Sequence, residues 1–98
     1  MLVHTVLFWL KDDLSEDQVS DFRAGLDSLQ GIESATGCYI GTPSTTDRPV
    51  VDRSYSFCLT VLFEDMAAHD VYQVHPLHTG FLEKFNTYWD KVVIYDAD

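Results

Sequence analysis

Basic residues are scarce in this chain of 98 residues. Six lysines and arginines stand against sixteen aspartates and glutamates, which gives a formal net charge of −10 at pH 7. Such a charge repels phosphate backbones and anionic lipid surfaces. Arg48 and Arg53 each follow an aspartate, so they form no basic patch. The composition therefore predicts a protein that binds neither nucleic acid nor a membrane.

Long apolar runs and cysteines are also few. The apolar stretch LVHTVLFWL, residues 2–10, is too short to span a bilayer and runs directly into Lys11 and two aspartates. The two cysteines, Cys38 and Cys58, lie in strand-like segments and suit buried free thiols better than a disulfide framework. We therefore expect a soluble protein of the cytoplasm.

Several motifs of common enzymes are missing. The sequence contains no glycine-rich phosphate loop and no G-x-S-x-G nucleophile motif, and neither cysteine has a histidine near it in sequence. No cofactor is predicted. A chain of this length with 46% hydrophobic residues suits a single domain over residues 1–98.

Apolar periodicity predicts an α+β fold. Strands alternate in polarity at every second residue, whereas helices repeat their apolar residues every three or four. Ser15 is a candidate cap for the first helix, Gly31 is a candidate stop, and Glu64 or Asp65 is a candidate cap for the second. The order β-α-β-β-α-β predicts a ferredoxin-like, four-stranded antiparallel sheet with its helices on one face. The predicted strands are residues 2–10, 35–41, 54–63 and 91–97, and the predicted helices are residues 14–31, 64–74 and 76–89.

The first predicted strand is apolar on both of its faces. In a ferredoxin-like fold the helices cover only one face of the sheet, so the other would expose apolar side chains to water. A second copy of the chain packed sheet to sheet would remove this exposure. The pattern therefore predicts a homodimer formed through the sheet face that carries no helices.

The stretch YQVHPLHTGF, residues 72–81, places two histidines around a proline. Pro76 disfavours a helical conformation at His75 and suits the first turn of a new helix, so His75 is expected at the junction in a capping position. Helical spacing then puts one apolar face on the new helix. The residues of that face are His78, Phe81, Leu82, Phe85 and Trp89.

Two interpretations of these histidines remain open. A histidine on an apolar face is often a core residue bonded to a backbone carbonyl, and Tyr72 could equally be packing. His4, however, shares a face of the first strand with apolar residues, and together with Tyr72 and His78 it could form an apolar pocket with a few polar groups. A metal bound by His75 and His78 with His4 or His69 is disfavoured, because the H-P-x-H spacing matches no recurrent zinc pattern.

Three segments together resemble the stress-responsive A/B barrel (Dabb) family of dimeric α+β barrels. They are MLVHTVLFWLKDDLSEDQ, VLFEDMAAHDVYQVHPLHTGF and YWDKVVIYD. The Tyr-x-x-His-Pro-x-His stretch is the most specific of these elements. The resemblance implies a face-to-face dimer over nearly the whole chain, and some plant members of the family are linked to stress tolerance.

The resemblance also implies two functional hypotheses. One is a stress-related protein that binds a small apolar or aromatic molecule, with His75, Phe81, Leu82, Phe85 and Trp89 lining the pocket. The other is a cofactor-free enzyme: one plant member closes a linear polyketide by aldol condensation, and related barrels oxidise aromatic polyketides. Family catalytic residues then match Tyr72, His78 and His4, where a neutral imidazole can remove a proton alpha to a carbonyl.

Overall fold

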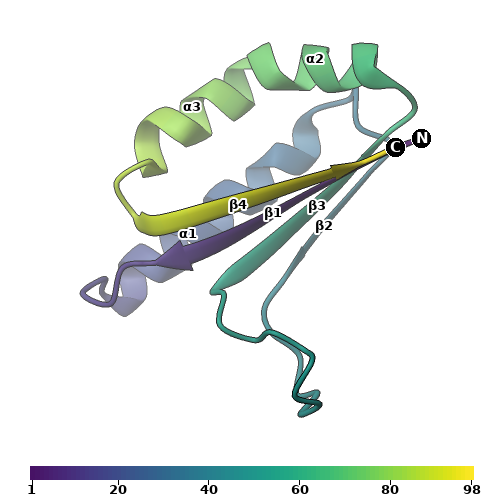
Figure 1. Cartoon of the computed structure of the whole chain (residues 1–98). Coiled ribbons are helices and arrows are strands. Elements are labelled where there is room, and N and C mark those ends of the chain that lie inside the picture. The colour runs from purple at the N-terminus through teal and green to yellow at the C-terminus, as the bar shows by residue number, and fades with distance from the viewer.

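The computed structural model describes residues 1–98 of the chain. Four strands form one antiparallel sheet in the order β2-β3-β1-β4, and all helices lie against one face of it (Figure 1). The arrangement is the predicted ferredoxin-like β-α-β-β-α-β fold, with the second helix divided in two. The elements are β1 (Leu2–Leu10), α1 (Glu16–Ser28), the 3₁₀ turn η1 (Leu29–Gly31), β2 (Gly37–Gly41), β3 (Phe57–Phe63), α2 (Met66–Val74), α3 (Pro76–Phe85) and β4 (Trp89–Ala97).

Capping side chains set the starts of α1 and α2. The Ser15 hydroxyl accepts the backbone N–H of Gln18, and the Gln18 side chain accepts the backbone N–H of Ser15, which completes a capping box. The Asp65 carboxylate accepts the backbone N–H of Ala68 at the start of α2. These bonds satisfy backbone donors that have no partner within the helix. They confirm Ser15 as one cap and select Asp65 over Glu64 as the other.

The junction between α2 and α3 follows from Pro76. Its ring disfavours a helical backbone at His75, which adopts φ −65° and ψ 138°. Val74 is therefore the last residue of α2, as predicted. His75 Nδ1 accepts the backbone N–H of Leu77 at 3.1 Å and caps α3.

The core lies between the helices and one face of the sheet. On β1, Leu2, His4, Val6 and Phe8 face the helices and are buried, while the residues between them are half-buried on the other face. Aromatic rings dominate this core, and Phe22 of α1 lies at its centre in contact distance of several of them. Fifteen buried apolar residues form one cluster. That cluster fixes how the helices sit on the sheet, since it joins β1, β2 and β3 to the helices, and Trp89 of β4 packs against it.

Two predicted boundaries differ from the structure by three residues or more. The last helix ends at Phe85 rather than at residue 89, because Trp89 pairs with Leu10 as the first residue of β4. The turn between them contains Asn86 and Thr87, which are poor helix formers. The third strand begins at Phe57, three residues later than expected.

No helix covers the second face of the sheet. Apolar side chains from the strands line it, and we call this surface the open face. It comprises Val3, Leu7, Trp9, Leu62, Val93 and Tyr95. Within one chain, β1 is thus covered on one side only.

Residues 42–56 link β2 to β3 by a long loop that extends beyond the sheet (Figure 1). None of the helices combines the length and apolar character that crossing a membrane requires.

Candidate functional site

A cavity of about 160 Å³ lies between the sheet and the helices α2 and α3. Most of its wall is apolar, and its four polar residues are His4, Tyr72, Gln73 and His78. Exposed side chains of α3 and β4 form its rim, so it opens at the edge of the sheet. A larger groove of about 370 Å³ runs between α1 and α3, but it contains no buried polar group and no histidine. The chemistry is therefore concentrated in the smaller cavity.

Tyr72 is a buried donor without an acceptor. Its side chain is 1% exposed, and its hydroxyl has no hydrogen-bond partner. Its ring lies against Phe63 at 5.2 Å and His78 at 4.9 Å, measured between ring centroids. Burial raises the pKa of the phenol well above its ordinary value, and the nearby Cys38 thiol adds to the rise. Tyr72 therefore stays a neutral hydroxyl that can donate to a molecule in the cavity.

His78 is held in one tautomer by the backbone. Its Nδ1 lies 3.0 Å from the carbonyl oxygen of Gln73, the residue before the last of α2. A carbonyl only accepts, so Nδ1 carries the proton and, in the neutral ring, Nε2 is left as an acceptor. Burial lowers the pKa of His78, and the neighbouring His4 and His69 lower it further against the opposing effect of the Gln73 bond. The ring is therefore a neutral base near pH 7.

His4 pairs with a carboxylate that sequence reasoning missed. The antiparallel register places His4 opposite Asp96 of β4, and His4 Nδ1 lies 2.5 Å from Asp96 Oδ1. His4 is 3% exposed, whereas the Asp96 side chain is 41% exposed at the sheet edge. The carboxylate accepts the Nδ1 proton and leaves Nε2 directed away from it. The ring of His4 lies within 6.3 Å of that of Tyr72, so it contributes to the same cavity.

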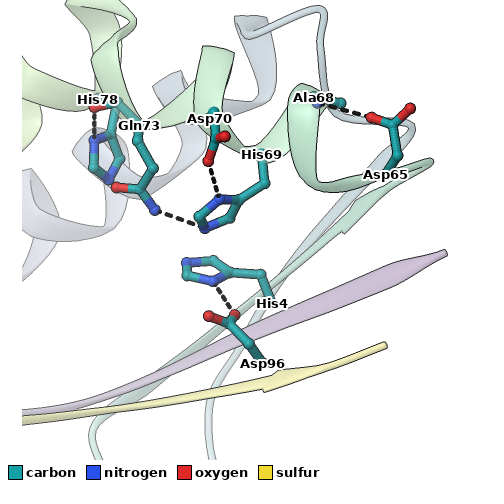
Figure 2. A network of polar contacts seen from close by, with 8 residues as sticks. All are labelled: His4, Asp65, Ala68, His69, Asp70, Gln73, His78 and Asp96. Atoms are coloured by element: carbon teal, nitrogen blue, oxygen red, sulfur yellow. Dashed lines mark hydrogen bonds and ion pairs between the residues drawn. The ribbon is translucent and has the colours of Figure 1, made fainter.

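Two further polar residues of α2 join this group. His69 Nδ1 lies 3.2 Å from Asp70 Oδ1, and its Nε2 lies 3.0 Å from the side-chain nitrogen of Gln73. Figure 2 shows the His69 ring facing that of His4, and their centroids are 5.3 Å apart. Helical spacing could have placed His69 on the face of Tyr72, three residues before it, and Gln73 beside His69, four residues after it.

The structure brings together most of the residues predicted for the site. Tyr72, His78 and His4 line the cavity, as do Phe81, Leu82 and Trp89, although Trp89 comes from β4 instead of a helix. Two predicted residues lie outside it. His75 caps α3, and Phe85 packs between α1 and α3 against Phe22 and Tyr88.

One cluster could hold a metal ion. It differs from the combinations considered from sequence, because it lacks His75 and His78 and includes a carboxylate. Ligand atoms of His4, His69 and Asp96 all lie within 4.8 Å of one another.

Known proteins resemble this chain over nearly its full length. The sequence matches the family described as the Stress responsive A/B Barrel Domain over residues 2–98. Olivetolic acid cyclase from Cannabis sativa is 26% identical over 94 residues, which cover 95% of this chain and 91% of the cyclase.

Solved structures share the fold. The hydroxynitrile lyase from Passiflora edulis has a TM-score of 0.80 and 22% identity, with 98% of this chain and 90% of the lyase covered. A dimeric ferredoxin-like protein of unknown function from Thermobifida fusca also has a TM-score of 0.80 and 22% identity. The match covers 98% of this chain and 88% of that protein.

Proposed function

Because the chain belongs to the stress-responsive A/B barrel domain family, known as Dabb, we propose that it is a homodimer that binds a small apolar or aromatic molecule in the cavity. The observation that carries the proposal is the Tyr72 hydroxyl, which is buried at the cavity without an acceptor. Leaving a buried hydroxyl unpaired costs about 1–3 kcal/mol. A ligand with an acceptor oxygen would recover that free energy.

The cavity wall and volume limit the ligand. Its apolar lining favours a hydrocarbon or aromatic body, and Tyr72 favours one carbonyl or similar oxygen on it. The volume of about 160 Å³ is smaller than the range of about 300–1,000 Å³ of common ligand pockets. An aromatic ring with a single carbonyl group therefore fits the proposal better than a long polyketide.

Homodimerisation is supported by the open face. Half-buried apolar side chains such as Leu7 and Val93 meet there without a helical cover. The Thermobifida fusca relative, which shares the fold, is described as dimeric. Packing two open faces together would remove this apolar surface from water.

A cofactor-free enzyme is the second candidate, and His78 favours it. In this candidate a substrate carbonyl accepts the Tyr72 hydroxyl, and His78 Nε2 takes a proton from the adjacent carbon. The electron pair of the broken C–H bond forms a carbon–carbon double bond, and the carbonyl π pair moves to the oxygen, where Tyr72 stabilises the enolate. The relatives named a cyclase and a lyase support it, and both aldol cyclisation and cofactor-free oxidation of an aromatic polyketide would begin with such a step.

Acetophenone and ethylbenzene form a matched pair of probes that differ mainly in the carbonyl oxygen. We expect acetophenone to bind the native protein more tightly in an NMR titration. Tyr72→Phe should lower the affinity for acetophenone by about tenfold, which corresponds to the loss of one hydrogen bond. The affinity for ethylbenzene should stay the same. Equal acetophenone affinity in the native protein and in Tyr72→Phe would remove the hydroxyl from the binding site.

The same ketone separates binding from catalysis. If His78 is a base, the native protein in D₂O should accelerate deuterium uptake at the acetophenone methyl group, as followed by NMR. His78→Gln should abolish the acceleration, whereas His75→Gln should retain it because His75 lies outside the cavity. Binding without any acceleration over buffer would leave the ligand-binding proposal intact and reject the enzyme.

A further inference from the structure

Four polar side chains form a column beside the cavity, from β4 to α2 (Figure 2). In order they are Asp96, His4, His69 and Asp70. Each histidine is bonded through Nδ1 to the carboxylate at its end of the column, at 2.5 Å for His4 and 3.2 Å for His69. The two imidazole rings face each other in the middle. The cavity needs only His4 of this set, so the column requires a separate explanation.

We propose that His4, His69 and Asp96 bind a divalent transition-metal ion such as Zn²⁺. Their ligand atoms already lie within 4.8 Å of one another, although they come from β1, α2 and β4. Two imidazole nitrogens and one carboxylate oxygen are a donor set that zinc accepts, and three protein ligands leave one position open. This site does not depend on the proposed ligand of the cavity.

Asp70 prepares His69 for coordination. Its carboxylate accepts the Nδ1 proton and fixes the tautomer in which Nε2 carries the free lone pair. A carboxylate on the far nitrogen is the common outer partner of a metal-binding histidine, where it orients the ring and strengthens its donation. The His69 side chain is only 14% exposed, so its ring is also held by its surroundings. The Gln73 amide, which now approaches His69 Nε2, is on a flexible side chain and can turn away.

The remaining ligands must move only a short distance. Zinc bonds of about 2.0–2.2 Å in a tetrahedral site place ligand atoms roughly 3.3–3.6 Å apart. The largest separations, up to 4.8 Å, would then shrink by roughly 1–1.5 Å. The 2.5 Å contact between His4 Nδ1 and Asp96 Oδ1 would instead widen to roughly 3.3–3.6 Å, because the ion replaces the Nδ1 proton, which leaves to water. His4 is buried and fixed, whereas Asp96 is partly exposed on the edge strand and can turn one of its two oxygens. The site therefore closes mainly by movement of Asp96.

The donor set also selects the ion. Imidazole ligands favour Zn²⁺, Co²⁺, Ni²⁺ and Cu²⁺, whereas Mg²⁺ and Ca²⁺ prefer oxygen ligands only. The net charge of −10 attracts cations of any kind. Discrimination against Mg²⁺ therefore distinguishes this site from general attraction by the acidic surface.

The test is calorimetric titration of the chelator-treated full chain at pH 7. We expect one Zn²⁺ per chain and no site for Mg²⁺. His69→Gln and Asp96→Asn should each lower the affinity for Zn²⁺ by tenfold or more. His75→Gln is the matched control and should bind as the native chain does, because His75 caps α3 outside the column. Circular dichroism shows whether each variant is folded. If His69→Gln does not fold, Asp96→Asn alone tests whether the predicted residues bind Zn²⁺.

Several outcomes would overturn the proposal. Zn²⁺ binding that is absent in the native chain, or that is unchanged in both folded variants, would exclude this site. Co²⁺ provides a second readout, since visible absorption should appear without a sulfur-to-metal charge-transfer band. Such a band would assign the ion to Cys38 or Cys58 instead, because both are free thiols.

Discussion

Tyr72 and His78 place polar atoms in a region where apolar side chains would pack without any cost of desolvation. The hydroxyl of Tyr72 contributes no bond to the fold, whereas His78 bonds to the backbone of Gln73. The two residues should therefore respond differently to substitution. A side chain that packs well but leaves a polar atom unpaired is typical of a position kept for binding.

Tyr72→Phe tests this at the level of stability. The change keeps the ring and removes an unpaired hydroxyl, so the free energy of unfolding should stay the same or rise by up to about 3 kcal/mol. Tyr72→Ala removes the buried ring as well and should cost about 3–5 kcal/mol. Thermal and denaturant unfolding measure both. A clear loss of stability in Tyr72→Phe would mean that the hydroxyl has a structural partner.

His78 should titrate at unusually low pH. Burial is the main cause, and the charges of His4 on β1 and His69 on α2 act in the same direction. The NMR titration midpoint should lie below the ordinary 6.5. The unfolded chain then takes up the proton first, so this residue's contribution to stability falls as pH drops from about 6.5 to the lower folded pKa. A midpoint at or above 6.5 would show that the surroundings do not lower the pKa of His78.

Part of the site could be predicted at the residue scale. His4 and His78 each lie on an apolar face with clear periodicity, so the sequence predicted that they point inward. Asp96 could not be found in this way, because its contact with His4 depends on the register between the first and last strands. That register is set by packing across the whole sheet.

At the scale of elements, the close approach of α1 and α3 depends on a glycine. A methyl group built on Gly25 of α1 would lie 2.4 Å from a ring carbon of Phe85, which is buried in the core. No side chain could be placed there without moving that ring. Gly80 of α3 is different, because a methyl group there would meet nothing within 4 Å.

These two glycines form a matched pair of substitutions. Gly25→Ala should destabilise the protein by about 1–3 kcal/mol through overpacking. Gly80→Ala should stabilise it by up to about 1 kcal/mol, because alanine has the higher helix propensity and its methyl group would clash with no neighbour. Denaturant unfolding of both variants measures the difference. Equal effects would show that α1 and α3 do not pack as closely as described.

The elements themselves were mostly predictable, and the exception has a physical reason. Helical spacing continues without a break from His78 through Phe85 to Trp89, so a local pattern extends the helix to residue 89. Strand pairing between Trp89 and Leu10 overrides it. Local periodicity contains no information about a partner strand at the other end of the chain.

For the whole molecule, the open face predicts its state of association. Leu7 lies near the middle of that face, between β3 and β4. Leu7→Glu would place a charge in the proposed interface, and sedimentation should then show a species of 11.2 kDa, whereas the native chain should sediment at twice that mass. Val74→Glu, on the exposed side of α2, should not change the native mass. A native chain that sediments as a monomer at micromolar concentration would reject the dimer.

The pairing of β1 with β4 has a consequence for folding. The first strand and the last must find each other across the entire chain, and such non-local pairing is slow to form. Val92, Ile94 and Asp96 of β4 complete the cavity rim and the bond to His4, so the site exists only after this strand has docked. Until then the edge of β1 is free to pair with a strand of another molecule, which is a route to aggregation. The proposed binding of a ligand and the protection against misassembly therefore depend on the same strand.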